Sequence, residues 1–511
     1  VLISWCKAGL AGDWLLVTVS IIVLCLLIFG LKKNIGLKTF LVCTCPIMIL
    51  IIIAGISFIN PSYNYLNLNE WKSLNIEENI SKEQNLEKAE FTLKSFKKIY
   101  ESSFTDKETS LNLSIEFKKK YKSFFKLNNS PCDILFKNYF KLINRESINF
   151  IPSCILSHNR LYVDFTYFIF QLSFGIAVYL NLKSIEEIHK ILYAISLNGG
   201  ILALAGIVQS LYYVPSNELK EIWGIWDVPE PRYYFASFTY KNHWSAFALL
   251  TFSSIVCLIY NKKFKSNLFN RIMLYLNMFI IFLSIPMSGS RSGIILMLIF
   301  VFIIIIFFFY KRILDIRRFK IFILVSISLS SFIIITLKFI NSKTDEMTSN
   351  TKNQINEIIE GKYPFRILLW KDIIKQISDK PLFGYGFNSY KAVNPKYQSE
   401  EVSVQRNLVT KYAHHEFSPI VGYAHNDWLE KTSEFGLVGV LPFFLYIFLI
   451  FKTLISTNSF TTKILLLGVI FYLLYAFIDF PTRSPCSFLL FSLIVGLAFK
   501  YNSLVKNIYY K

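Results

Sequence analysis

"RIMLYLNMFIIFLSIPMSGSRSGIILMLIFVFIIIIFFFY", residues 271–310, consists of two long apolar runs joined by a short polar turn. The runs cover 271–288 and 292–310, and residues 289–291 separate them. An α-helix needs about 20 apolar residues to cross the hydrocarbon layer of a bilayer. A barrel strand would instead show about ten residues of alternating polarity, a pattern that this stretch lacks. The stretch therefore predicts a hairpin of two transmembrane helices with its turn at the membrane surface.

Apolar runs of this length recur along the whole chain of 511 residues. Hydrophobic residues make up 53% of it and aromatic residues 17%, and the mean hydropathy is +0.44, well above the range of soluble proteins. Helices are expected because backbone groups that face lipid must be hydrogen-bonded within their own segment. The predicted spans are 14–31, 37–59, 161–182, 189–213, 243–260, 271–288, 292–310, 319–340, 434–452, 461–479 and 485–501.

The net charge of +20 indicates how these spans are oriented. Lysine and arginine are concentrated in one alternating set of short connections, such as 32–38 and 311–320, and cytoplasmic loops carry such an excess. Because the charge is scattered over several loops, nucleic-acid binding is disfavoured. The C-terminus is then inside and the N-terminus outside, and the first residue, Val1, leaves open whether a helix precedes it. The connections expected outside are 60–160, 214–242, 289–291, 341–433 and 480–484.

Five segments follow from this topology. They are two N-terminal transmembrane helices (1–59), an extracytoplasmic helical cap (60–160), a transmembrane bundle (161–340), an extracytoplasmic loop with an amphipathic helix at 364–379 (341–433) and C-terminal transmembrane helices (434–511). Cys132 and Cys154 both lie in the cap, where oxidising conditions would allow a disulfide, and the sequence leaves that pairing open.

The turn of the opening hairpin is the first candidate site. "SGSRSG" places Arg291 between two spans, where a charged side chain needs water, an anion or a partner. The guanidinium could simply reach the lipid headgroups. However, small residues such as Gly289 and Gly293 leave room for a ligand and expose backbone N–H groups to it. We therefore treat the turn as a candidate anion site.

A second candidate lies in "FRILLWKDIIKQISDKPLFGYGFNSY", residues 365–390. Arg366 precedes Trp370 by four residues, which puts both on one face of the predicted helix. Pro381 and the turn-forming residues after it end the helix. "GYG" resembles a potassium-channel filter, but the Thr-Val that precedes it in such filters is missing, so we reject a channel.

The third candidate is "GYAHNDWLEKTSEFGLVGVLPFF", residues 422–444, where a polar run enters a predicted span. Asp427 and Glu430 have the spacing of a capping box, so a helix should begin near 427. His425 would stand just before its first turn, where the helix dipole disfavours a positive charge and favours an imidazole able to accept a proton. The alternative is a capped, solvated helix start without chemistry.

Further polar residues are expected on the outer side at the mouths of other spans. "FTYKNHWSAF" and "FIDFPTRSP" each could be an interfacial anchor when considered alone. Together, the outer arginines could hold a diphosphate bidentately, while a neutral histidine or a carboxylate could accept a proton from a hydroxyl. We find no Asp-X-Asp metal clamp and no P-loop in the sequence. The candidate substrate-binding residues are Arg232, Asn242, His243, Asn426, Asp427, Glu434, Asp479 and Arg483.

These motifs, in this order, resemble the O-antigen ligase and polymerase family of bacterial membrane glycosyltransferases. The resemblance rests on "YKNHWSAF", "SGSRSG", "RILLWKDIIKQISDKPLFGYGFNSY", "HNDWLEKTSEFGLVGV" and "FIDFP", and is most specific from about 231 to 500. It implies an all-α polytopic membrane protein similar to GT-C glycosyltransferases, with about 11–12 transmembrane helices and two extracytoplasmic insertions. Family ligases commonly have twelve spans, one more than the runs above.

The resemblance also implies an activity. An inverting enzyme without a metal or other cofactor would transfer a glycan from undecaprenyl diphosphate at the outer side of the bacterial plasma membrane. Arg291 and Arg366 would hold the diphosphate and His425 would activate the acceptor hydroxyl. Lipid A core, another glycan and a protein side chain are the possible acceptors, and ligase-type transfer is favoured over polymerisation. Alternatives of another class are a lipid-linked glycan transporter or flippase, which would place charges at mid-bilayer, and a scaffolding protein.

Overall fold

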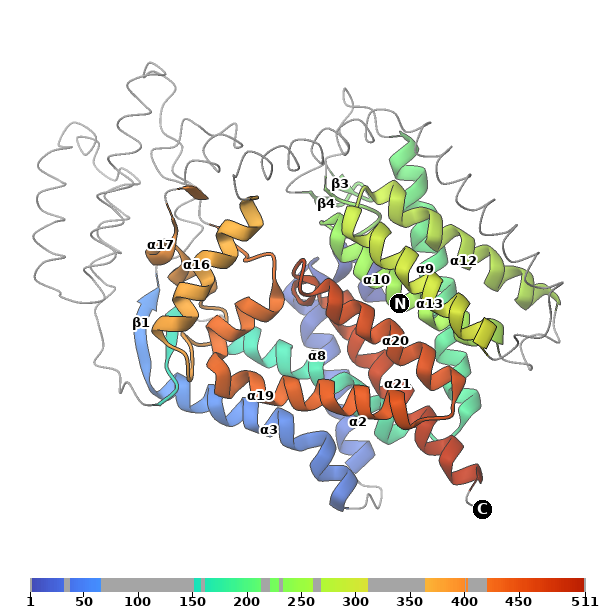
Figure 1. Cartoon of the computed structure of the whole chain (residues 1–511), viewed down its shortest axis with the longest axis horizontal. Helices are drawn as coiled ribbons and strands as arrows, with labels where there is room; N and C mark the ends of the chain where they lie inside the picture. Colours follow the sequence, from blue (N-terminus) through green and yellow to red (C-terminus); the bar gives the residue numbers. More distant parts are fainter. Residues whose placement is uncertain are drawn as a thin grey trace, which may run out of the picture. The chain divides into compact units, whose positions relative to one another are not determined.

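The computed structural model describes residues 2–31, 37–65, 151–157, 161–212, 221–228, 233–260, 268–310, 364–399, 401–402 and 421–509. Helices dominate these residues (Figure 1). The longer helices are α2 (Asp13–Leu31), α3 (Leu37–Ile59), α8 (Leu161–Asn181), α9 (Ile185–Tyr212), α10 (Lys241–Tyr260), α12 (Leu268–Ser288), α13 (Arg291–Tyr310), α16 (Phe365–Asp379), α19 (Asp427–Ser456), α20 (Phe460–Tyr475) and α21 (Pro485–Tyr509). The short elements are α1 (Leu2–Trp5), η1 (Lys7–Gly9), β1 (Pro61–Tyr65), β2 (Cys154–Ser157), β3 (Glu221–Ile222), β4 (Trp226–Asp227), α17 (Tyr390–Tyr397) and η2 (Pro481–Arg483).

The helices confirm that the chain is an all-α polytopic membrane protein. Among the described residues, seven helices are long and apolar enough to cross a bilayer, and three apolar stretches of 10–17 residues accompany them. Each predicted span has a helix at its place except 319–340, which lies outside the described residues. The predicted amphipathic helix is α16, which begins one residue later than expected. The total of 11–12 spans and the similarity to GT-C enzymes stay predictions.

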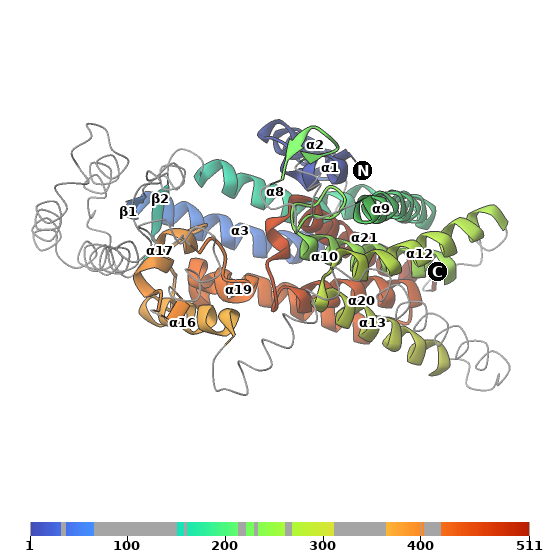
Figure 2. The same cartoon turned by 90° about the horizontal axis from the view of Figure 1, so that it is seen from above.

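The chain divides into two compact units, which we describe separately. Unit 1 comprises Val1–Cys43, Tyr167–Glu360 and Tyr446–Lys511. Its centre is α10, which contacts α9, α12, α13, α20 and α21 and is almost wholly buried (Figure 2). Glycines on the helices that face α10 allow this close approach, as is usual between membrane helices. A Cβ atom on Gly199 of α9 would lie 2.4 Å from Thr251 of α10, and one on Gly468 of α20 would lie 2.5 Å from Ser253.

Unit 2 comprises Thr44–Thr166 and Gly361–Leu445. The insertion at 60–160 belongs to this unit, and near each of its ends the chain forms a strand. These two strands, β1 (Pro61–Tyr65) and β2 (Cys154–Ser157), pair in parallel. The helical cap predicted between them lies outside the described residues, as does Cys132. Cys154 is buried at the start of β2. The helical cap itself stays a prediction, and the described edges of the insertion are joined by strand pairing across about ninety residues.

Helix α19 is interrupted within unit 2. Gly436 has φ 67° and ψ 179°, far from helical values, so residues before and after it form two helical segments. A φ in this range favours glycine because other residues clash through their Cβ atom. The sequence predicted a span from 434, so the break separates a first segment, 427–435, from most of the apolar helix.

Candidate active site

The predicted site residues belong to both units. Arg291, Asn242, His243, Asp479 and Arg483 lie in unit 1, whereas Arg366, His425, Asn426, Asp427 and Glu434 lie in unit 2. Arg232 lies outside the described residues. The predicted convergence of all these side chains on one face stays a prediction, and the local geometry of each group is described below.

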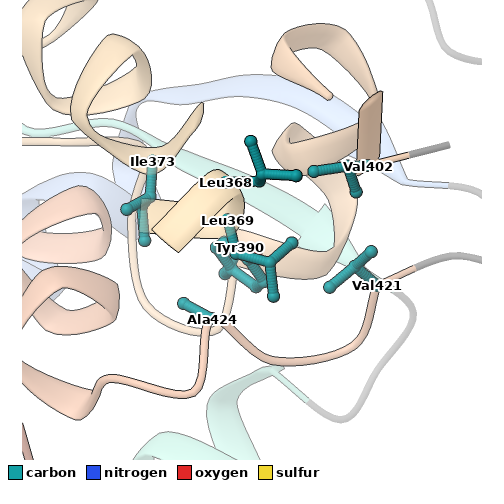
Figure 3. Packing of buried hydrophobic residues seen from close by; sticks show 7 residues of the cluster. All are labelled: Leu368, Leu369, Ile373, Tyr390, Val402, Val421 and Ala424. Carbon is teal, nitrogen blue, oxygen red and sulfur yellow. The ribbon is translucent and has the colours of Figure 1, made fainter. Parts of the chain in front are cut away.

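Arg366 is positioned by the apolar face of α16. Leu368, Leu369 and Ile373 of this helix are buried in a cluster that also contains Tyr390, Val402, Val421 and Ala424 (Figure 3). The spacing of the apolar residues follows the helical period, which explains why the helix forms and which side it buries. Arg366 is half-buried in the first turn, next to Phe365, which packs against the cluster. The helix thus holds a guanidinium at the edge of an apolar core.

His425 lies in the turn before α19 and has an unusual backbone conformation. Its φ is 51°, in the left-handed region that few residues other than glycine adopt. Such conformations cost about 1–3 kcal/mol and persist only where the surroundings hold them. The side chain is half-buried, and both neighbours, Ala424 and Asn426, are buried. Because of this backbone conformation, the Cα–Cβ bond of His425 points in a direction that an extended or helical backbone at this position would not give it.

The residues that hold this turn differ from the predicted capping box. Asn426, and not Asp427, caps the helix: its Oδ1 accepts a hydrogen bond from Leu429 N at 3.0 Å. Glu430 Oε2 accepts from Ala424 N, also at 3.0 Å, and not from the backbone N–H of Asp427, which a capping box of Asp427 and Glu430 would have used. The predicted start of the helix at 427 is confirmed. The assignment of the cap was wrong by one residue because Asn and Asp are nearly equivalent as caps.

The turn of His425 is joined to the helix of Arg366 through a tryptophan. Trp370 Nε1 donates to Ala424 O at 3.2 Å. Trp370 lies one helical turn after Arg366, and Ala424 immediately precedes His425. Both backbone groups of Ala424 are therefore engaged, its N–H by Glu430 and its carbonyl by Trp370. This arrangement fixes the histidine turn relative to α16 within unit 2.

The acidic residues of α19 are buried. Glu434 is fully buried, and its Oε2 accepts a hydrogen bond from Lys431 Nζ at 2.6 Å. Lys431 also stands over the ring of Phe387, 5.3 Å from its centroid. Asp427 is 3% exposed. Lys431 and Glu434 therefore form an ion pair across one turn of α19, which makes this carboxylate a structural partner in unit 2.

A second cluster of polar side chains joins the end of α16 to α17. Asp379 Oδ2 accepts hydrogen bonds from the hydroxyls of Tyr385 and Tyr397. Burial, together with these contacts, raises the pKa of Tyr385 well above its usual value, so the phenol keeps its proton. The sequence motif "FGYGF" therefore contains a buried structural tyrosine.

In unit 1, the turn before Arg291 belongs to a buried polar network. Ser290 Oγ donates to Asn242 Oδ1 at 2.8 Å and also contacts the hydroxyl of Tyr475 at 2.8 Å. The Nδ2 of Asn242 donates to Asp479 Oδ2. Arg291, half-buried, follows as the first residue of α13. The structure therefore brings together two predicted residues, Asn242 and Asp479, beside the arginine turn. Tyr475 was not predicted, since nothing in its apolar surroundings marked it.

His243 is buried among aromatic rings. Its ring lies 5.3 Å from Tyr240 and 5.1 Å from Phe480, edge to face in both cases, and Tyr240 stacks on Phe480. Ser487 Oγ donates to the backbone oxygen of His243 at 3.1 Å. Arg483 is half-buried in η2, within the predicted tight turn. These contacts make His243 part of the packing beneath the network of Asn242 and Asp479.

Comparison with known proteins finds a family match for the region that contains Arg291, Arg366 and the turn of His425. Residues 276–444 match the family model described as O-Antigen ligase. This region includes Arg291, Arg366 and His425. This region is similar to an O-antigen ligase domain. The matched domain begins within α12 and ends within α19, so it excludes Asn242 and Asp479, and it covers about a third of the chain.

A relative supports the same relationship over a shorter stretch. A protein of Rickettsia felis, named "Putative polysaccharide ligase", is 28% identical over 94 residues. The aligned stretch is 18% of this chain and 20% of the relative, so it spans about a fifth of that protein. The resemblance to the O-antigen ligase family is thereby confirmed for the domain.

Proposed function

We propose that this protein is a membrane glycosyltransferase of the ligase type. It would transfer a glycan from undecaprenyl diphosphate to an acceptor hydroxyl at the outer side of the bacterial plasma membrane. The observation that supports this most directly is the bond from Trp370 to Ala424, which ties the helix of Arg366 to the turn of His425 inside the O-antigen ligase domain. A guanidinium and an imidazole held by one local framework are the groups that such a transfer needs.

The arginines would act on the leaving group. A diphosphate that separates from a sugar gains negative charge on its bridging oxygen, and fixed cations stabilise that charge in the transition state. Guanidinium groups suit this role because they bind phosphate oxygens through paired N–H donors and stay protonated. Arg366 at the start of α16 and Arg291 at the start of α13 would each supply such donors, so the reaction would not need a metal ion.

His425 would act on the acceptor. The acceptor oxygen attacks the anomeric carbon and forms the new glycosidic bond, while the bond from that carbon to the diphosphate oxygen breaks. The hydroxyl proton passes to the imidazole, and undecaprenyl diphosphate leaves with the bonding electrons. Attack from the side opposite the leaving group inverts the anomeric configuration. The acceptor hydroxyl would belong to lipid A core, to the end of another glycan or to a protein side chain, with ligase-type transfer favoured over polymerisation.

The test uses purified protein in vesicles that contain an undecaprenyl diphosphate-linked glycan and an acceptor. Arg291→Ala, Arg366→Ala and His425→Ala should each reduce transfer by at least about 100-fold, the usual effect of losing one transition-state contact. Lys371→Ala and Arg271→Ala are the matched controls, because Lys371 is an exposed positive charge in the helix of Arg366 and Arg271 is an exposed positive charge in α12, the helix before Arg291. Unchanged transfer in the three site variants would refute the proposal. Movement of the glycan across the bilayer without a new glycosidic bond would instead identify a flippase.

A further inference from the structure

The break in α19 is filled by the loop that follows α16. In an unbroken helix, the N–H groups of Leu437 and Val438 would donate to the carbonyls of Ser433 and Glu434. Here Leu437 N donates to Pro381 O at 2.8 Å, and Val438 N donates to Leu382 O at 3.0 Å. Loop 381–386 therefore accepts the hydrogen bonds that the helix has given up.

The same loop also donates to the carbonyls that the break leaves open. Tyr385 N donates to Ser433 O at 3.0 Å, and Gly386 N donates to Glu434 O at 2.7 Å. Two helical hydrogen bonds are thus replaced by four bonds between loop 381–386 and the two sides of the break. The N–H groups of Leu437 and Val438 and the carbonyls of Ser433 and Glu434 therefore all have hydrogen-bond partners in the loop. The loop and the two segments of α19 are held together by these backbone hydrogen bonds.

Glycine is required where the two segments approach most closely. A Cβ atom on Gly436 would lie 2.3 Å from the carbonyl carbon and oxygen of Leu382. On Gly384, which has φ 63°, it would lie 2.5 Å from Ser433 O. Both contacts are with backbone atoms, which cannot move aside as a flexible side chain can. An alanine at either position would therefore force the loop away from α19.

Buried side chains strengthen the contact within the last turn of α16, before the loop. Ser433 Oγ donates to Gln376 Oε1 at 2.9 Å, and Gln376 Nε2 donates to Asn394 Oδ1 at 3.1 Å. All three side chains are at most 1% exposed. Helices α16, α17 and the first segment of α19 are therefore linked by one chain of hydrogen bonds in a place where an unpaired polar group is strongly unfavourable.

These contacts define the position of α16 along the first segment of α19. Near its start, Trp370 binds Ala424; near its end, Gln376 binds Ser433; beyond its end, loop 381–386 occupies the break. We propose that Gln376, Ser433 and loop 381–386 are positioning elements that keep Arg366 in register with His425. The inference rests on the proposed function for the roles of those two residues. A displacement of about 1 Å in such a pair can lower a rate by about 100-fold.

The kinetic test measures kcat per folded protein and the donor KM. We expect Gln376→Ala and Ser433→Ala to lower kcat by about 10- to 100-fold, with a smaller change in KM for the lipid-linked glycan. Ser378→Ala and Thr432→Ala are matched controls, because each hydroxyl donates only to the carbonyl four residues earlier in its own helix. Ser433→Thr, which keeps the hydroxyl, should restore most of kcat. A merely structural role would change the amount of folded protein and leave kcat per folded protein as in the wild type.

Hydrogen exchange gives a readout that needs no activity. In Gly436→Ala, the amides of Tyr385, Gly386, Leu437 and Val438 should all exchange faster, while those of α20 keep the wild-type rate. Faster exchange at Leu437 and Val438 alone would show that the loop does not hold the break, and would overturn the inference. If wild-type protein shows no transfer, the proposed function fails and the positioning role with it. If wild type transfers but the Gln376 and Ser433 variants keep full kcat, only the positioning role is overturned.

Discussion

The indole nitrogen of Trp370 donates a hydrogen bond to the carbonyl oxygen of Ala424 over 3.2 Å. Trp370 follows Arg366 by one helical turn, and Ala424 immediately precedes His425. The contact therefore connects two candidate catalytic residues that are about sixty positions apart in the chain. The apolar cluster of α16 supports this contact, because Ala424 belongs to the cluster and Trp370 packs against it.

Trp370→Phe should weaken this connection while keeping an aromatic ring in the cluster. The change removes the only N–H donor of the side chain and leaves the Ala424 carbonyl without this partner, which costs about 1–2 kcal/mol. We expect a lower unfolding midpoint in detergent and reduced transfer per folded protein. Trp14→Phe, at an exposed tryptophan of α2, serves as control. Wild-type stability and transfer in Trp370→Phe would contradict the role of the bond.

The left-handed backbone of His425 predicts a ranking of substitutions. Asparagine accepts a positive φ more readily than most residues, whereas a β-branched residue is strained there. His425→Asn should therefore unfold at nearly the wild-type temperature, and His425→Val should be less stable by about 1–2 kcal/mol. Both should lose transfer, because neither side chain can accept a proton as imidazole does. Thermal unfolding of purified protein, measured beside the transfer assay, checks this ranking; equal stability of the two variants would argue against a strained turn.

Asn242 and Asp479 should be energetically coupled in unit 1. Their side chains are buried and joined by a hydrogen bond, and Asn242 also accepts from Ser290. Asp479→Ala and Asn242→Ala should each lower the free energy of unfolding. The double variant should lower it by less than the sum of the two single effects. We expect a coupling energy of about 0.5–3 kcal/mol from unfolding of the four proteins of a double-mutant cycle. Additive effects on the free energy of unfolding would mean that the two side chains are not energetically coupled.

Cys154 predicts a dependence of stability on pH. Burial raises the pKa of its thiol from 9.0 to about 12. Between these values the unfolded chain loses a proton that the folded protein keeps, so the folded state binds more protons. The contribution of Cys154 to stability is therefore complete below pH 9 and is lost as the pH rises towards 12.

The measurement for Cys154 combines unfolding and alkylation. Cys154→Ser should reduce the loss of stability between pH 9 and 12, because serine does not ionise there. In the wild type, iodoacetamide should modify the Cys154 peptide slowly at pH 8 and faster as the pH rises, because burial keeps the thiol protonated and shielded. Rapid alkylation at pH 8 would contradict the buried thiol.

The sequence by itself determined the helices that depend on local pattern. The apolar runs have the length of the bilayer, so ten of the eleven predicted spans lie on helices within the part of the chain that is described. Amphipathic spacing located α16, and cap-forming residues located the start of α19 at 427. The sequence also suggested chemical roles for Arg291, Arg366 and His425, because a guanidinium or imidazole group beside a predicted membrane span needs an anion, a partner or water.

Only the tertiary structure decided how these pieces are joined. The cap on Asn426, the contact of Asn242 with Asp479 and the pairing of β1 with β2 each depend on atoms brought together by folding. The break at Gly436 shows this most clearly: a glycine in an apolar run is compatible with a continuous helix, and the loop that takes over its hydrogen bonds lies some fifty residues earlier. Local propensity fixes elements, whereas buried polar groups find their partners only when distant segments meet.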